Sequence, residues 1–125
     1  MHEARQAMPP LDLYADLAWL TRPPQDFTTR CRGLGALPDA DLGREVRILA
    51  GSALDTNQLT RLARSMEKLR SAGRSFAPLV KFRLGIISNA TTHLLVPPLV
   101  ATAARHGIDL ECIEADFDQV VMEAL

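Results

Sequence analysis

The chain has 125 residues, of which 14 are Lys or Arg and 15 are Asp or Glu, so its formal net charge is -1. This length fits one modest domain, and the balance of charge argues against binding of nucleic acid or of an anionic membrane. The two cysteines, Cys31 and Cys112, are far apart and in unlike contexts. They are therefore expected to be reduced thiols rather than a disulfide or a metal site.

The amino terminus carries no recognisable targeting signal. Residues 1–10 include His2, Glu3 and Arg5 and have no apolar core, unlike a secretory signal peptide. No run of residues approaches the roughly 18 apolar residues that a membrane span needs. We therefore expect a soluble, cytoplasmic protein that does not associate with membranes.

Helical patterns dominate residues 1–75. An apolar segment over residues 11–20 ends at Arg22-Pro-Pro24, because a residue before proline avoids the helical conformation. Asp26 is a candidate cap for a helix over 27–34. A third helix opens at Pro38, and its apolar residues recur at helical spacing as far as Ala53. These segments are expected to form one bundle.

The fourth helix has the clearest signals. Asp55 and Gln58 have the spacing of a capping box, apolar residues recur over 59–69, and Gly73 stands where the helix should end. The other faces of this helix carry a basic strip: Arg61, Arg64, Lys68 and Arg70. Because Glu67 interrupts this strip, we interpret it as a solvated surface rather than a site for an acidic partner.

After a linker over 71–78 the pattern alternates between strand and helix. A buried strand is expected over 82–88, a helix from Val96 to Gly107, a second strand over 108–113 and a last helix over 119–125. This order predicts a right-handed parallel βαβ unit. The side chains expected to pack against its strands are Leu94, Leu99 and Ala103. Leu84 or Ile86 should join the fourth helix in one core.

The predicted fold class is α/β, with an N-terminal helical bundle (1–75) packed on a short parallel βαβ unit (76–125). Two parallel strands cannot bury both of their faces, since parallel sheets are covered on both sides and usually have several strands. Either a partner chain completes the sheet, a homo-oligomer being one such case, or these residues are the front part of a longer protein.

The turn after the first strand is the candidate ligand site. Ser88, Asn89, Thr91 and Thr92 offer hydroxyls and an amide at the carboxyl end of the strand, where open α/β sheets bind ligands. Asp116 follows the second strand at the same edge. The structural alternatives are hydrogen bonding within the turn and, for Asp116, capping of the last helix. We favour these alternatives.

No catalytic or metal-binding residue is assigned. Ser88 and His93 are five residues apart on a turn with no carboxylate to orient them, and activation of a nucleophile needs that geometry. Asp39 and Asp41 have the D-x-D spacing of a phosphotransfer site, but no strand precedes them, so a role at a helix start is favoured. No histidine has the spacing to a cysteine that would form a zinc site.

Several passages of this sequence resemble the N-terminal region of FkbH-like proteins. They are Leu84-Gly-Ile-Ile-Ser-Asn-Ala-Thr-Thr92, the Leu-rich helix after it, Arg105-His-Gly-Ile-Asp-Leu-Glu111, Glu114-Ala-Asp-Phe-Asp-Gln119, and the upstream segment 49–59. The resemblance covers residues 45–125. It implies the first part of a flavodoxin-type, SGNH-hydrolase-like three-layer domain, which in that family precedes a haloacid-dehalogenase-type catalytic domain.

The resemblance also implies a role. FkbH-like proteins are associated with moving a glyceryl unit from a phosphorylated three-carbon donor onto an acyl carrier protein in polyketide-type pathways. The sequence lacks the dehalogenase-type part, with its nucleophilic aspartate and Mg²⁺, so no cofactor is expected in this chain. Ala90 falls where SGNH hydrolases carry their nucleophilic serine.

The expected role is therefore a non-catalytic docking or positioning module. Its expected partners are an acyl carrier protein or the downstream domain of the same polypeptide. A divergent SGNH-like hydrolase using the turn from Ser88 to His93, and a standalone helical interaction module, are the alternatives.

Overall fold

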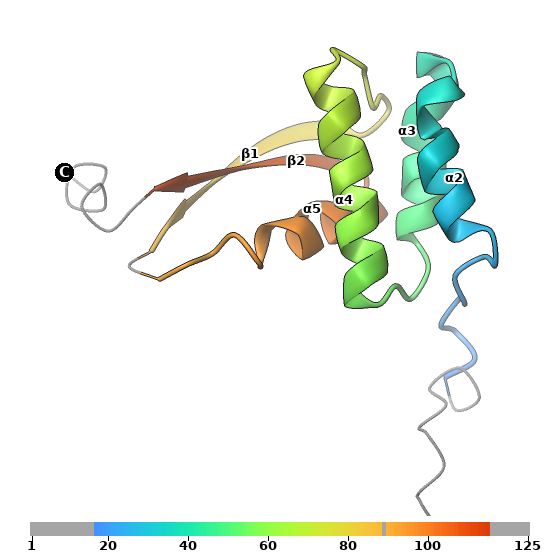
Figure 1. Cartoon of the computed structure of the whole chain (residues 1–125), viewed down its shortest axis with the longest axis horizontal. Helices are drawn as coiled ribbons and strands as arrows, with labels where there is room; N and C mark the ends of the chain where they lie inside the picture. Colours follow the sequence, from blue (N-terminus) through green and yellow to red (C-terminus); the bar gives the residue numbers. More distant parts are fainter. Residues whose placement is uncertain (1–16, 89, 116–125) are drawn as a thin grey trace, which may run out of the picture.

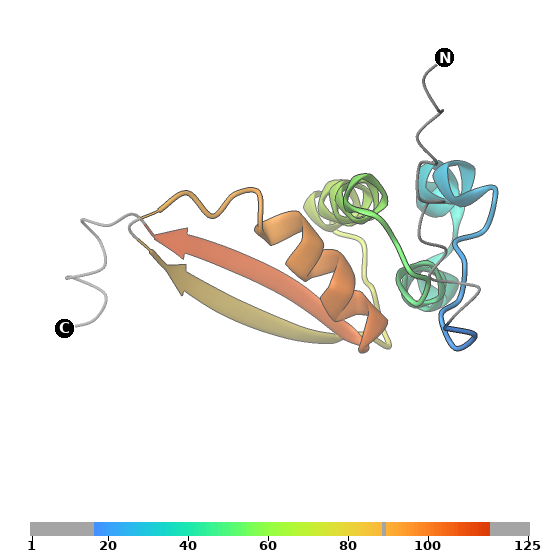
Figure 2. The same ribbon diagram turned by 90° about the horizontal axis from the view of Figure 1, so that it is seen from below.

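The computed structural model describes residues 17–88 and 90–115. Their elements are α2 (Phe27–Gly33), η1 (Leu34–Ala36), α3 (Asp39–Ala50), α4 (Thr56–Ser71), β1 (Val80–Ile87), α5 (Val96–Arg105) and β2 (Ile108–Ala115). Helices α2, α3 and α4 stand side by side, and the two strands extend away from them (Figure 1). Helix α5 lies between these two parts, beside the sheet (Figure 2).

The fold is α/β, and the predicted parallel pair of strands is confirmed. Val80 lies opposite Ile108 at the start of the pair, and Ile87 lies opposite Ala115 at its end. Strand β1 begins two residues before the predicted start, and β2 runs two residues beyond its predicted end. Among the described residues, no helix is long and apolar enough to cross a membrane.

The predicted ends of α4 and α5 are confirmed, and each has a local cause. The Asp55 side chain accepts a hydrogen bond from the backbone N–H of Gln58 at 2.8 Å, and the Gln58 side chain accepts one from the Asp55 N–H at 2.9 Å. Gly73 and Gly107 end the two helices with φ values of 79° and 78°, a region that costs most residues energy but not glycine. Helix α5 starts at Val96 with prolines in its first turn, where they are tolerated.

Four helical expectations differ from the structure or lie outside it. Asp26 stands at the cap position of α2 but makes no side-chain cap hydrogen bond. Helix α3 ends at Ala50, and the N–H of Ala53 instead donates to the Thr21 carbonyl at 2.9 Å. Of the segment expected over 11–20, residues 17–20 form a turn, and residues 11–16 lie outside the described residues, as does the helix expected over 119–125.

One hydrophobic core joins the helices to the base of the sheet. Its large, fully buried side chains are Phe76, Leu34, Leu42, Leu49, Leu62, Met66 and Val46. Helix α5 contributes Val100, Ala101 and Ala104 to the same cluster and packs on α3, α4 and β2. The shared core that we predicted is therefore confirmed for the fourth helix, but α5 rather than the first strand joins it from the βαβ unit. Leu84 and Ile86, which we expected to join it, are not part of the cluster.

Two expectations about apolar packing are wrong. Leu94 is 79% exposed, because it precedes the first turn of α5 and so does not lie on the helix face that meets the sheet. The first strand was expected to be buried, but Phe82 is 57% exposed while Leu110, its neighbour in the pair, is buried. Residues paired in this way share a face of the sheet, so the cover that α5 provides extends over β2 and stops short of β1.

An ion pair also fastens the sheet to the bundle. The guanidinium of Arg70 on α4 donates to the carboxylate of Asp109 on β2, which is buried, and lies 5.6 Å from the centre of the Phe76 ring. Burial opposes the charge of Arg70, but the hydrogen bond and negative charge of Asp109 outweigh burial and raise the pKa of the guanidinium. Arg70 therefore stays charged and holds the start of β2 against α4.

Met66→Asp should destabilise the chain strongly. The side chain of Met66 is fully buried in the shared core, so a carboxylate at this position would be buried with no partner. We expect a loss of about 3 kcal/mol or more in the free energy of unfolding in urea. Arg64→Asp, at an exposed position of the same helix, is the matched control and should change stability by about 0.5 kcal/mol. Equal stability of Met66→Asp and the parent would contradict the core assignment.

Gly43→Ala should also destabilise, although alanine is the better helix former. A Cβ at Gly43 would lie 2.0 Å from the Phe76 carbonyl oxygen, whereas a Cβ at Gly33 would meet nothing within 4 Å. The backbone around Phe76 must therefore move away from α3, at a cost of about 1 to 3 kcal/mol. Thermal unfolding should show a lower Tm for Gly43→Ala than for Gly33→Ala. A Tm for Gly43→Ala at or above that of the parent would refute this close approach.

Candidate functional site

The turn from Ser88 to Thr92 lies at the carboxyl end of β1, at the end of the sheet farthest from the helical bundle (Figures 1 and 2). The Ser88 hydroxyl accepts a hydrogen bond from the backbone N–H of Ala90 at 3.0 Å. The Thr92 hydroxyl donates to the carboxylate of Glu114 near the end of β2. Thr91 is exposed, and Asn89 and Asp116 lie outside the described residues.

These contacts favour a structural role for the turn. The Ser88 hydroxyl closes the turn locally, and Thr92 links the turn to β2 across the end of the sheet. His93 is exposed, and within residues 17–88 and 90–115 no histidine or carboxylate is hydrogen-bonded to Ser88. The geometry that would activate a serine nucleophile is therefore not present there.

The other chemically reactive groups that the structure describes lie apart from the turn. Asp39 and Asp41 stand in the first turn of α3, and Asp39 forms an ion pair with Arg74 at 2.5 Å. Burial raises the pKa of the Cys31 thiol to about 11, and burial followed by the charge of Glu114 raises that of Cys112. Both thiols are thus protonated at neutral pH, and a thiol is a poor nucleophile. The part of the chain that the structure describes holds no cluster of three side chains able to bind a metal ion.

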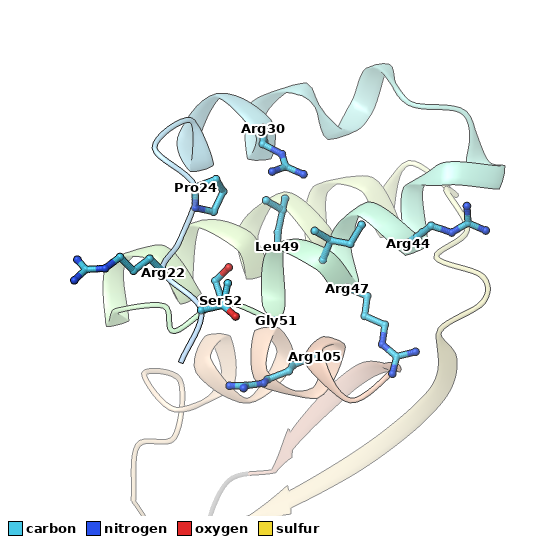
Figure 3. Close-up of a pocket in the computed structure, with 11 residues that line it drawn as sticks. Arg22, Pro24, Arg30, Arg44, Arg47, Leu49, Gly51, Ser52 and Arg105 are labelled. Atoms are coloured by element: carbon cyan, nitrogen blue, oxygen red, sulfur yellow. The ribbon is translucent and has the colours of Figure 1, made fainter. Parts of the chain in front are cut away.

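The structure reveals a second site at the opposite end of the molecule. A hollow of about 640 Å³ opens where the segment before α2, helix α2, helix α3 and the end of α5 meet. Its lining has an apolar part, formed by Pro24 and Leu49 (Figure 3) and by Ile48. Five arginines surround this lining: Arg22, Arg30, Arg44, Arg47 and Arg105. We call this site the arginine hollow.

The arginine hollow has a strongly positive character. Among the described residues no Asp or Glu lines it, and the nearby Glu45 pairs with Arg30, whose Nε lies 2.8 Å from the Glu45 carboxylate. Within the described part of the chain, no carboxylate pairs with Arg44, Arg47 or Arg105. Such a concentration of cations in a partly apolar recess attracts anions.

Sequence reasoning missed the arginine hollow. The basic strip considered from the sequence lies on α4, and none of its four residues lines the hollow. The one local signal is the spacing of Arg44 and Arg47, which puts both side chains on neighbouring positions of α3. Arg22, Arg30 and Arg105 join them only through the tertiary fold, and an overall charge of -1 conceals such a local excess.

Comparison of the chain with known protein families, with curated proteins and with solved structures found no match. The described residues offer two candidate places for a function: the sheet with its terminal turn, and the arginine hollow.

Proposed function

We propose that this chain is the non-catalytic N-terminal portion of an FkbH-like protein. In this proposal it docks or positions an acyl carrier protein, or the group that the carrier holds, beside a downstream catalytic domain that performs glyceryl transfer. The described residues of the passages that resemble the family lie in the second half of β1, the turn after it, α5 and β2, and, for the upstream segment 49–59, at the end of α3 and the start of α4. They belong to the part of the chain that in the proposal begins a flavodoxin-type, SGNH-like three-layer domain.

The observation that carries the proposal is the unfinished sheet. Val80 and Phe82 on β1 are 68% and 57% exposed, and among the described residues β1 pairs with β2 alone. Parallel sheets are normally covered on both faces, and exposed strand edges are avoided because they pair with other chains. The helices, in contrast, bury their large apolar side chains in the shared core. A chain with packed helices and an exposed, unpaired strand edge is suited to pack against further polypeptide through its sheet.

In this proposal the turn is not catalytic. It uses the Ser88 and Thr92 hydroxyls in local hydrogen bonds, so it serves as a structural or positioning element. Mg²⁺ belongs, by the family resemblance, to the downstream catalytic domain.

The purified chain should hydrolyse neither a small acyl ester such as p-nitrophenyl acetate nor a phosphate ester such as p-nitrophenyl phosphate. The physical reason is that, within residues 17–88 and 90–115, no base or orienting carboxylate is hydrogen-bonded to Ser88. Initial rates should equal the background rate and should be the same for Ser88→Ala and His93→Ala. Turnover that copurifies with the chain and falls about 10²-fold or more in either variant would establish the divergent-hydrolase alternative instead.

The docking role predicts binding to one of two partners. A ¹⁵N-labelled chain is titrated with a polyketide-type holo acyl carrier protein and, separately, with the downstream part of an FkbH-like protein, which holds the rest of the three-layer domain and the dehalogenase-type domain. We expect residue-specific shifts with a Kd of about 1 to 100 μM, in the range of transient complexes. For this downstream part the shifts should include Val80 and Phe82, and Phe82→Lys should weaken binding at least tenfold.

Trp19→Lys is the control for Phe82→Lys, because Trp19 is also an exposed aromatic residue, at 72%, but lies outside the sheet. Its affinity should equal that of the parent chain. If neither partner shifts any resonance at about 0.5 mM, well above the expected Kd, the docking role is wrong.

A further inference from the structure

We infer that the arginine hollow is a docking site for an acidic protein segment, in which several carboxylates surround one apolar side chain. This inference stands apart from the proposed function, which rests on the sheet and on the family resemblance. The arginine hollow is formed by the helices and lies at the other end of the molecule from the turn (Figures 1 and 3).

The first argument is the unbalanced charge. Arg44, Arg47 and Arg105 all line the hollow and have no carboxylate partner within the described residues. Arg47 and Arg105 stand in the last turns of α3 and α5, where a cation interacts favourably with the helix dipole. Arg44 lies in the middle of α3, away from that end. A ligand that carries several anionic groups would supply the carboxylates that these three cations lack.

The second argument is the apolar lining. Ile48 is 53% exposed although it is a large aliphatic residue, and Pro24 and Leu49 line the same recess. Protein interfaces commonly place an apolar contact at the centre and polar or charged contacts at the rim. The hollow has this arrangement, with arginines around an aliphatic centre. A ligand that fits it therefore carries an apolar side chain as well as negative charge.

The third argument is the spacing of the cations. Figure 3 shows the guanidinium groups of Arg22, Arg44, Arg47 and Arg105 spread around the hollow and pointing in different directions rather than converging on one point. A single phosphate or carboxylate is bound well by one or two guanidinium groups that face it together. Spread cations suit a ligand with separated negative groups. A protein segment with several Asp or Glu side chains has that form.

The test uses a fluorescein-labelled helical peptide with glutamates at helical spacing around one leucine, and a matched peptide with glutamine in place of glutamate. Fluorescence anisotropy is measured with the full chain at about 0.15 M salt, where long-range attraction is screened. We expect the glutamate peptide to bind at least tenfold more tightly than the glutamine peptide. Ile48→Ser should weaken its binding at least threefold.

The double variant Arg44→Glu, Arg47→Glu should weaken binding of the glutamate peptide at least tenfold. The matched control is Arg61→Glu, Arg64→Glu, which changes the net charge equally at exposed positions of α4 outside the arginine hollow. Its affinity should stay within twofold of the parent. Circular dichroism and the urea midpoint of each variant establish that a lost affinity does not come from unfolding.

Four results would overturn the inference. Absence of peptide binding, or equal loss in both double variants, would mean that the hollow has no specific attraction for acidic segments. Displacement of the peptide by an equimolar amount of pyrophosphate or of a short DNA duplex would assign the hollow to a small anion or to nucleic acid. Self-association that Arg47→Glu abolishes would assign it to a second copy of the chain. Because no carrier protein or catalytic domain is present, these results are independent of the proposed function.

Discussion

The packing of α5 between the helical bundle and β2 is the interaction on which the rest of the structure depends. Ala101 and Ala104 of α5 are fully buried. Because their side chains are small, α5 can pack closely against both α3 and α4. On its other side α5 covers Leu110 of β2. Apart from this contact, the pair formed by Arg70 and Asp109 fastens the sheet to α4. Without α5 the two strands would have almost no apolar surface to pack on.

The sequence predicted the parts of the fold whose causes are local. A capping box, two helix-ending glycines and the prolines at the start of α5 act within a few residues of their own positions, so they can be read without knowing the tertiary structure. The position of Leu94 and the exposure of Phe82 could not be predicted in this way. An apolar run indicates that the side chains of a strand are buried against other residues. It does not show whether those other residues belong to the same chain.

The candidate sites, too, could be predicted from the sequence only where their causes are local. The location of the turn follows from the strand before it, but its hydrogen bonds depend on Glu114, which only the strand register brings near Thr92. The arginine hollow depends on contacts among segments that are distant in sequence, so only the Arg44 and Arg47 spacing was visible. Total charge is a poor guide in such a case, because acidic residues on other surfaces cancel the sum without cancelling the local field.

Helix α5 also connects the two candidate sites, which lie at opposite ends of the molecule. Its first residue, Val96, follows the loop that begins at the turn, and its last residue, Arg105, lines the arginine hollow. A helix of ten residues is about 15 Å long, and Val100, Ala101 and Ala104 bury it against the bundle. In the two proposals, a partner at the arginine hollow and a domain packed on the sheet would therefore bind at opposite ends of α5. The length of this helix, rather than a loop, would then set their separation.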